Sequence, residues 1–202
     1  MNNELTKYLL KEFGFDSICF TPISIGLINE TQLLETNLGK YILQRINTDI
    51  FKNPQNIDDN IQVIKTYLFE QDEDYLFPQL VSDKSGKSLF NVNDGWYRVF
   101  EFIENATSIK VVDNASQAYE AAKQFGKFTY LLKNFPINQL KISLPQFHDL
   151  ALRQEQFNAS LNSANQLILN ECQILIDKLK SNEHIYFWYN NYINNNAVKC
   201  RV

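Results

Sequence analysis

The spacing of apolar residues changes along the first part of the chain. From Leu5 the apolar positions recur at helical spacing until Gly14, and residues 17–46 then follow the alternation typical of β-strands. The β-like stretches are residues 17–24, 31–36 and 41–46, and the Asn and Gly at 37–39 suit a tight turn. The pattern predicts one helix followed by an antiparallel meander.

A second helix and further strands are predicted next. Asn53 suits a helix N-cap and Pro54 suits the first helical position. The apolar residues that follow form one helical face: Ile57, Ile61, Ile64 and Leu68. Residues 77–103 are β-like again, with Ser85-Gly86 and Asp94-Gly95 as turns, and they add two or three strands.

The chain turns helical after Asn105. Helical spacing covers residues 116–135, 144–161 and 165–180, and the aromatic-rich residues 183–193 also suit a helix. We therefore expect an α+β protein with two domains, a β-rich lobe over 1–105 and a helical lobe over 106–202.

Composition narrows the classes of partner. Apolar residues make up 45% of the chain, and its 19 Lys and Arg are scattered within a net charge of −4. A nucleic-acid-binding protein normally shows a concentrated basic face, so we expect no nucleic-acid partner. No apolar run approaches the ~20 residues that span a bilayer, so we expect a cytoplasmic protein with no membrane contact.

Four phrases, in order, resemble one family. They are Gly26–Thr31 (GLINET), Tyr41–Phe51 (YILQRINTDIF), Tyr97–Asn105 (YRVFEFIEN) and Phe147-His148-Asp149. Together with the order of elements, they resemble the aminoglycoside phosphotransferase-like superfamily, on the branch that includes N-acetylhexosamine kinases. The resemblance implies a protein-kinase-like two-lobe fold. Its N-lobe is an antiparallel five-stranded sheet with one packed helix, and the helical C-lobe is incomplete in this chain.

The first phrase implies a loop over the phosphates of ATP. GLINET lies between the first two predicted strands, where kinases fold such a loop. The residues that the resemblance assigns to nucleotide binding here are Gly26, Leu27, Ile28, Asn29 and Thr31. An ordinary hairpin turn is the alternative.

The next two phrases imply a cation and a hinge. Aligning YILQR with the kinase V-A-I-K pattern puts Arg45 in the position of the phosphate-binding lysine, with Asp59 or Asn60 of the following helix as its partner. An exposed arginine at a sheet edge is the alternative. The resemblance also places backbone groups of Glu101, Phe102 and Ile103 against adenine, whereas a buried strand without a ligand is the alternative.

One motif is a look-alike. Ser85-Gly86-Lys87-Ser88 ends like a P-loop, but the opening glycine of that motif falls at Val81. The motif also joins two predicted strands instead of a strand and a helix, so we interpret it as a turn.

The residues that carry out phosphoryl transfer have no match in the sequence. In this family the catalytic loop follows a stretch resembling Val198–Val202, so catalytic residues and the Mg²⁺ site are expected beyond Val202. The chain is interpreted as the N-terminal portion of an ATP-dependent small-molecule kinase that is inactive alone. Its hydroxyl-bearing substrate is most simply a sugar, phosphorylated at the anomeric hydroxyl of an N-acetylhexosamine.

Two alternatives remain. One is a non-catalytic kinase-like module that binds nucleotide or protein, and the other is an α+β interaction domain with no nucleotide site. The incomplete helical lobe implied by the resemblance exposes apolar surface, so self-association through that surface is also expected.

Overall fold

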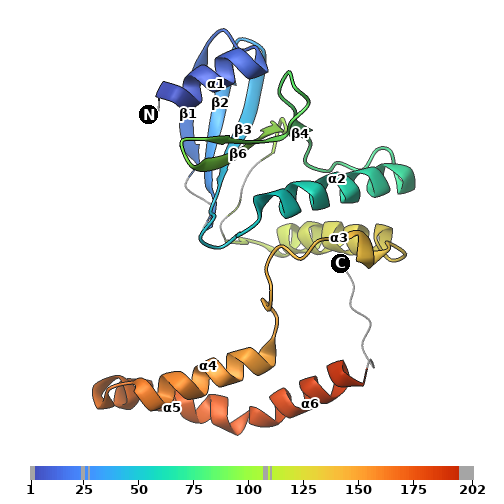
Figure 1. Ribbon diagram of the computed structural model, residues 1–202. Coiled ribbons are helices and arrows are strands. Elements are labelled where there is room, and N and C mark those ends of the chain that lie inside the picture. Colours follow the sequence, from blue (N-terminus) through green and yellow to red (C-terminus); the bar gives the residue numbers. More distant parts are fainter. Residues whose placement is uncertain (1–2, 24–25, 27, 107–108, 110, 196–202) are drawn as a thin grey trace. The chain divides into compact units, whose positions relative to one another are not determined.

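The computed structural model describes residues 3–23, 26, 28–106, 109 and 111–195 (Figure 1). The chain divides after Ser143 into two compact units. Leu27 and the stretch 198–202, which carry two of the sequence-based expectations, lie outside the described residues.

The first unit contains a sheet in which every described strand pairing is antiparallel. The strands are β1 (Ile18–Ile23), β2 (Glu30–Thr36), β3 (Gly39–Ile46), β4 (Leu80–Val81), β5 (Leu89–Val92) and β6 (Gly95–Glu101). Their order is β1-β2-β3-β6-β4, with β5 also paired to β6. The predicted α+β class and antiparallel sheet are confirmed, with three strands after the helix.

The sheet has six strands, one more than the expected five, yet it is only five positions wide. One edge of β6 pairs with β3 over residues 96–101. The other edge is shared, because β5 pairs with residues 95–98 and β4 with residues 99–100. Two short strands thus take the place of one.

Local sequence accounts for the turns. α1 (Asn3–Phe13) stops at Gly14, whose φ of +76° is one that glycine adopts without strain. In the β5–β6 hairpin the two residues with positive φ are Asn93 (48°) and Asp94 (61°), as a type I′ turn requires. The turn therefore lies one residue before the predicted Asp94-Gly95.

The P-loop look-alike is a turn, as predicted. Gly86 has a φ of +84°, and Asp83 Oδ1 accepts hydrogen bonds from the backbone N–H groups of Ser85 and Lys87 at 2.8 and 3.0 Å. The hydroxyl of Tyr8 in α1 donates to Asp83 Oδ2 at 2.8 Å, which ties this turn to the first helix.

One face of the sheet is covered by α1. Figure 1 shows this helix lying against the strands near the N-terminus. The apolar core on this face comes from α1, the segment after it and alternate strand positions: Leu5, Leu9, Phe15, Leu34, Leu43, Phe90, Val92, Tyr97 and Val99. Since side chains alternate across a strand, the residues between these positions point to the opposite face.

The second helix, α2 (Pro54–Gln71), starts at the predicted proline. It packs along α3 (Ala115–Leu131), and the two lie side by side in Figure 1. Leu68 of α2 is buried in one apolar cluster with Leu132 and Phe135, which follow α3. Of the predicted apolar face, Leu68 is therefore buried and Ile64 packs against the same cluster. An ion pair of 2.8 Å joins Lys127 of α3 to Asp72 at the end of α2.

The predicted lobe boundary at 105/106 differs from the division into compact units. α3 belongs to the same unit as the sheet because α2 holds it there. The assignment of residues 1–105 and 106–202 to two functional lobes stays a prediction.

The second unit contains three helices that match predicted helical stretches. They are α4 (Leu150–Ser163), α5 (Gln166–Ser181) and α6 (Glu183–Asn194), and a short 3-10 helix, η1 (Ile137–Gln139), precedes this unit. Asp149 and Asn165 cap α4 and α5 by accepting hydrogen bonds from backbone N–H groups. Among the residues described, no helix combines the length and apolar character that crossing a membrane requires.

Candidate functional site

The loop between β1 and β2 is held to β3 by the side chain of Asn29. Asn29 Oδ1 accepts a hydrogen bond from the backbone N–H of Asn47 at 3.0 Å. Its Nδ2 donates to Oε1 of Gln44 at 3.4 Å. Asn29, one of the residues assigned to nucleotide binding, therefore bonds one residue within β3 and one just after its end.

Gln44 is the centre of a polar cluster on the face opposite α1. Its Nε2 donates to Thr31 Oγ1 at 3.3 Å, and its Oε1 accepts from Arg98 Nε at 3.0 Å and Arg98 Nη2 at 2.6 Å. Strand register brings these three side chains together, because Gln44 lies opposite Thr31 in β2 and opposite Arg98 in β6. The cluster connects the β1–β2 loop to the centre of the sheet.

Two buried charged side chains continue this cluster toward α2. Arg98 is 7% exposed and Asp58, on α2, is 4% exposed. Burial lowers the pKa of Arg98 to about 10, against the opposing effect of Asp58, so the guanidinium stays charged at neutral pH. Burial likewise raises the pKa of Asp58, although the hydrogen bond from Ser88 Oγ (2.7 Å to Oδ2) and the charge of Arg98 favour its carboxylate.

Both charged groups have unused hydrogen-bonding capacity. Within the described part of the chain, Arg98 Nη1 and Asp58 Oδ1 are buried without a hydrogen-bond partner. A buried polar group left in this way costs free energy. Gln32 Oε1 of β2 is also buried without a partner among the described residues, but Arg98 and Asp58 are the charged side chains of this kind.

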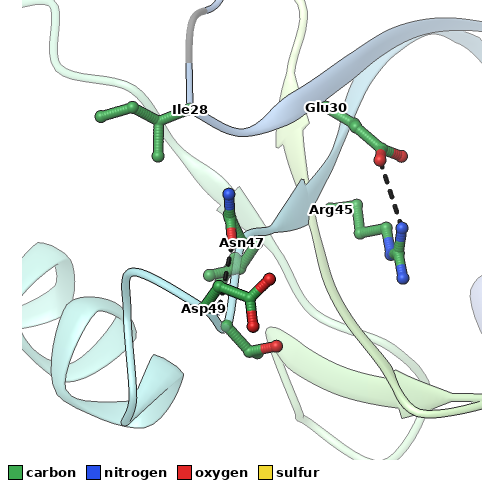
Figure 2. Close-up of a pocket in the computed structure, with 7 residues that line it drawn as sticks. Ile28, Glu30, Arg45, Asn47 and Asp49 are labelled. Carbon is green, nitrogen blue, oxygen red and sulfur yellow. Dashed lines mark hydrogen bonds and ion pairs between the residues drawn. The ribbon is translucent and has the colours of Figure 1, made fainter.

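Arg45, the predicted phosphate-binding cation, lies elsewhere. Its Nη1 is 3.2 Å from Glu30 Oε1, and both side chains are largely exposed to solvent (Figure 2). Arg45 is one residue beyond Gln44, so strand alternation puts it on the side of Leu43 and Tyr97, away from the polar cluster.

The cavity beside Arg45 is unsuited to phosphate. It measures about 200 Å³ and is lined by Ile28, Glu30, Asn47 and Asp49 among others (Figure 2). Two carboxylates, Glu30 and Asp49, and one guanidinium line this cavity, so its net negative charge repels an anion. Arg45 as a phosphate ligand therefore stays a prediction that this geometry does not favour.

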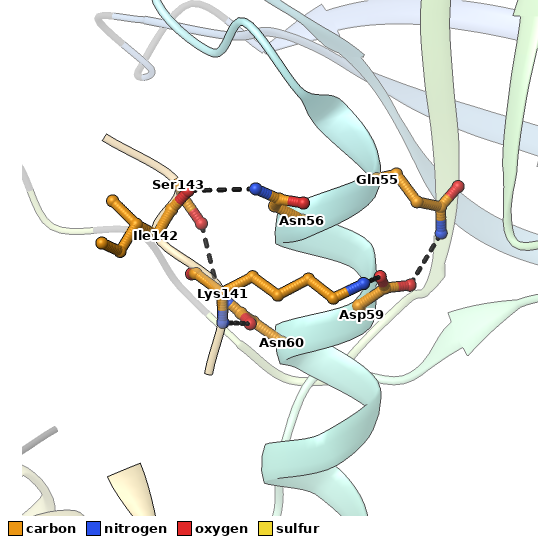
Figure 3. Close-up of polar contacts among 7 residues, drawn as sticks. All are labelled: Gln55, Asn56, Asp59, Asn60, Lys141, Ile142 and Ser143. Carbon is orange, nitrogen blue, oxygen red and sulfur yellow. Dashed lines mark hydrogen bonds and ion pairs between the residues drawn. The ribbon is translucent and has the colours of Figure 1, made fainter. Parts of the chain in front are cut away.

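The predicted partnership of Arg45 with Asp59 or Asn60 is wrong. Asp59 accepts hydrogen bonds from Lys141 Nζ and from Gln55 Nε2, the latter at 2.8 Å (Figure 3). Asn60 bonds the backbone of Lys141 twice, accepting from its N–H and donating to its carbonyl, each at 2.8 Å. This side of α2 faces the segment 141–143, and the preceding residue, Asp58, faces the sheet.

The predicted hinge begins at Glu101, the last residue of β6. The backbone N–H of Glu101 donates to the carbonyl of Gln79 at 2.9 Å, so it is not available to a ligand. No hydrogen bond to the backbone N–H of Phe102 or Ile103 occurs among the described residues outside the helices and strands. Their part in adenine binding stays a prediction.

Sequence reasoning missed the residues that build the cluster, Gln44, Arg98 and Asp58. A signal for Gln44 was present, because aligning YILQ, instead of YILQR, with V-A-I-K puts Gln44 at the lysine position. Arg98 lies inside the quoted phrase YRVFEFIEN but was not assigned a role.

Magnesium has no evident ligands in the described chain. No three His, Cys, Asp or Glu side chains come together there in a way that would hold a metal ion. We assign no residue of this chain to Mg²⁺.

The fold resembles that of a solved phosphotransferase. The comparison finds a crystal structure described as spectinomycin phosphotransferase, APH(9)-Ia, in complex with ADP and spectinomycin, with a TM-score of 0.53 and 15% sequence identity. The match covers 91% of this chain and 57% of that chain. No protein-family model matches the sequence.

This likeness shows the fold. It makes the chain a kinase-like α+β protein that spans somewhat more than half the length of the phosphotransferase it matches.

Proposed function

We propose that this chain is the nucleotide-binding part of an ATP-dependent small-molecule phosphotransferase. The observation that carries the proposal is the polar cluster of Asn29, Thr31 and Gln44, which anchors the β1–β2 loop on a kinase-like sheet. Kinases place such a loop over the phosphates of ATP. The neighbour in the structure comparison is described with ADP bound, which supports the same class of ligand here.

The remaining predicted nucleotide contacts form part of the proposal. Gly26, Ile28 and Asn29 would lie over the phosphates, and Leu27, outside the described residues, belongs to the same loop. Adenine would meet the backbone of Phe102 and Ile103 after β6.

The acceptor is proposed to be the hydroxyl of a small molecule, with the anomeric hydroxyl of an N-acetylhexosamine as the first candidate. The support is the resemblance of the four sequence phrases. Magnesium would enter with the nucleotide, where it neutralises charge on the β- and γ-phosphates.

Nucleotide binding is tested first, by calorimetric titration of the purified chain with ATP, ADP and adenosine. We expect ATP and ADP to bind, and Thr31→Val to weaken ADP binding by roughly tenfold, because the hydroxyl that supports the loop is lost. The matched control is Thr21→Val, an exposed strand threonine of β1. Absence of binding by the unsubstituted chain at millimolar nucleotide contradicts the proposal.

Phosphoryl transfer is tested separately, by incubating the chain with labelled ATP, Mg²⁺ and a panel of N-acetylhexosamines. Since no residue of this sequence is assigned to proton acceptance or to the metal, we expect no transfer. Transfer that survives purification to homogeneity would contradict this expectation and show catalytic groups that we did not identify.

A further inference from the structure

Arg98 has more donors than its surroundings use. A guanidinium carries five N–H donors. The described contacts use only two of its nitrogens, Nε and Nη2, and both bond the same oxygen of Gln44. Nη1 is buried without a partner in the described chain, and the aromatic ring of Phe100 lies 5.0 Å from the guanidinium carbon. The neighbours therefore orient the Arg98 side chain but leave its Nη1 without a hydrogen-bond acceptor.

The surroundings of Arg98 match those of a phosphate-binding cation in a kinase. Protein kinases use a lysine on the third strand, paired with an acid from the following helix. Here the corresponding residue on the α2-facing side of β3 is Gln44, which is neutral. The opposite residue in the neighbouring strand is Arg98, and the following helix supplies Asp58. The cation and the acid are both present, but the cation comes from β6.

Arg98 also has a direct connection to the β1–β2 loop. It bonds Gln44, and Gln44 bonds both Asn29 and Thr31. The exposed alternative, Arg45, is already paired with Glu30 and has Asp49 in the same cavity. Of these two arginines, Arg98 is the one whose guanidinium is not neutralised by a directly bonded carboxylate.

We propose that Arg98, held in place by its two hydrogen bonds to Gln44, is the phosphate-binding cation of the nucleotide site, with the buried Asp58 of α2 as the acid whose charge opposes that of Arg98. This inference rests on the proposed function. The free Nη1 donates to a phosphate oxygen of the bound nucleotide, in a charge-assisted hydrogen bond that a guanidinium forms well. Because Nη1 is covered in the ligand-free protein, binding requires a local shift of the side chains above it.

The test compares nucleotides with and without phosphate. The chain is titrated with ADP and adenosine, both unsubstituted and as the double variant Arg98→Met/Asp58→Asn, which removes the two buried charges together. We expect the double variant to bind ADP roughly ten- to a hundredfold more weakly while its adenosine affinity is unchanged. Lys123→Met is the matched control, because Lys123 forms an exposed ion pair with Glu120 on α3, and the ADP affinity of this variant is expected within about twofold of the unsubstituted chain.

The two proposals fail in different ways. If the unsubstituted chain binds neither ADP nor adenosine, the nucleotide site itself is refuted and Arg98 loses its proposed role with it. If the unsubstituted chain binds ADP and the folded double variant binds it equally well, only the role of Arg98 is refuted.

A measurement on the unsubstituted chain covers the case in which the variants do not fold. The ¹⁵Nη resonances of the arginine side chains are recorded by NMR during addition of ADP or adenosine. We expect ADP, and not adenosine, to shift the Arg98 signals, and an Arg98 that does not respond to ADP overturns the proposal.

Discussion

The two faces of the sheet are filled in opposite ways, although the same strands supply both. Toward α1, β3 and β6 contribute Leu43 and Val99, which are 2% and 0% exposed within an apolar core. Toward α2, the same strands contribute Gln44 and Arg98, which bond each other beside the buried Asp58. One face is thus closed mainly by apolar packing, with Gln32 Oε1 as an unpartnered acceptor on it among the described residues, and the other by a network that includes charged side chains with unused donors and acceptors.

This difference suggests that the α1 face mainly stabilises the fold, whereas the α2 face has the proposed binding role. Apolar burial provides most of the free energy of folding and leaves no group that needs a further partner. A buried charge with an unmet hydrogen bond lowers stability, so its presence calls for a reason such as a ligand. We expect substitutions on the α1 face to change folding, and those on the α2 face to change binding as well.

The largest effect is expected on the α1 face. Leu43→Ala removes a side chain that is 2% exposed and leaves a cavity, so we expect a loss of about 2–5 kcal/mol in the free energy of unfolding. Urea titration followed by circular dichroism measures it. ADP affinity of the folded fraction is expected to stay unchanged. A selective loss of ADP binding would contradict the inference that the α1 face affects folding alone.

A smaller and non-additive effect is expected on the α2 face. Arg98→Met leaves Asp58 buried without its nearby cation and is expected to cost about 1–3 kcal/mol. Asp58→Asn in the same chain is expected to restore part of that loss, because the remaining charge is then gone. A double-mutant cycle measures the coupling, and simple additivity would show that the two side chains do not interact.

The contributions of two buried carboxylates, Asp58 on α2 and Asp83 beside α1, to the free energy of unfolding are expected to change with pH in opposite directions. The pKa of Asp58 is raised, chiefly by burial, so the folded chain holds this proton more tightly than the unfolded chain does. Its contribution to stability is therefore largest at acid pH, and it declines as pH rises from about 3.8 through the raised pKa.

Asp83, which Tyr8 of α1 contacts, behaves in the reverse sense. Burial alone would raise its pKa, but hydrogen bonds from Ser85, Lys87 and Tyr8 outweigh burial and lower it. Its contribution is present above about 3.8 and is lost as pH falls through the lowered pKa. Melting curves of Asp58→Asn and Asp83→Asn from pH 3 to 7 check this, since the two differences from the unsubstituted chain should change with pH in opposite directions.

The smallest effect is expected for the exposed arginine. Arg45→Met breaks a solvent-exposed pair with Glu30, so we expect a change of no more than about 1 kcal/mol in the free energy of unfolding. The same thermal and urea measurements apply. A larger loss would mean that the exposed side of β3 contributes more than surface ion pairs usually do.

The order of elements could be predicted from the sequence because its signals are local. Gly14 ends a helix, Pro54 begins one, and alternation marks β3 without reference to any other part of the chain. The kinase-like fold followed from that order together with the four phrases. Asn29 lies between β1 and β2, as expected for GLINET, whereas the phosphate-binding role of that loop stays a prediction.

The candidate site itself depended on tertiary structure. Gln44 and Arg98 are 54 residues apart, and Asp58 and Ser88 are 30 apart, so no local pattern joins them. Strand register decided that Gln44, and not Arg45, faces α2, since a step of one residue moves a side chain to the other face. By itself, then, the sequence determined the elements and their apolar faces, through short-range backbone and hydrophobic preferences. Only the packing of β3, β6 and α2 decided which charged groups are buried together.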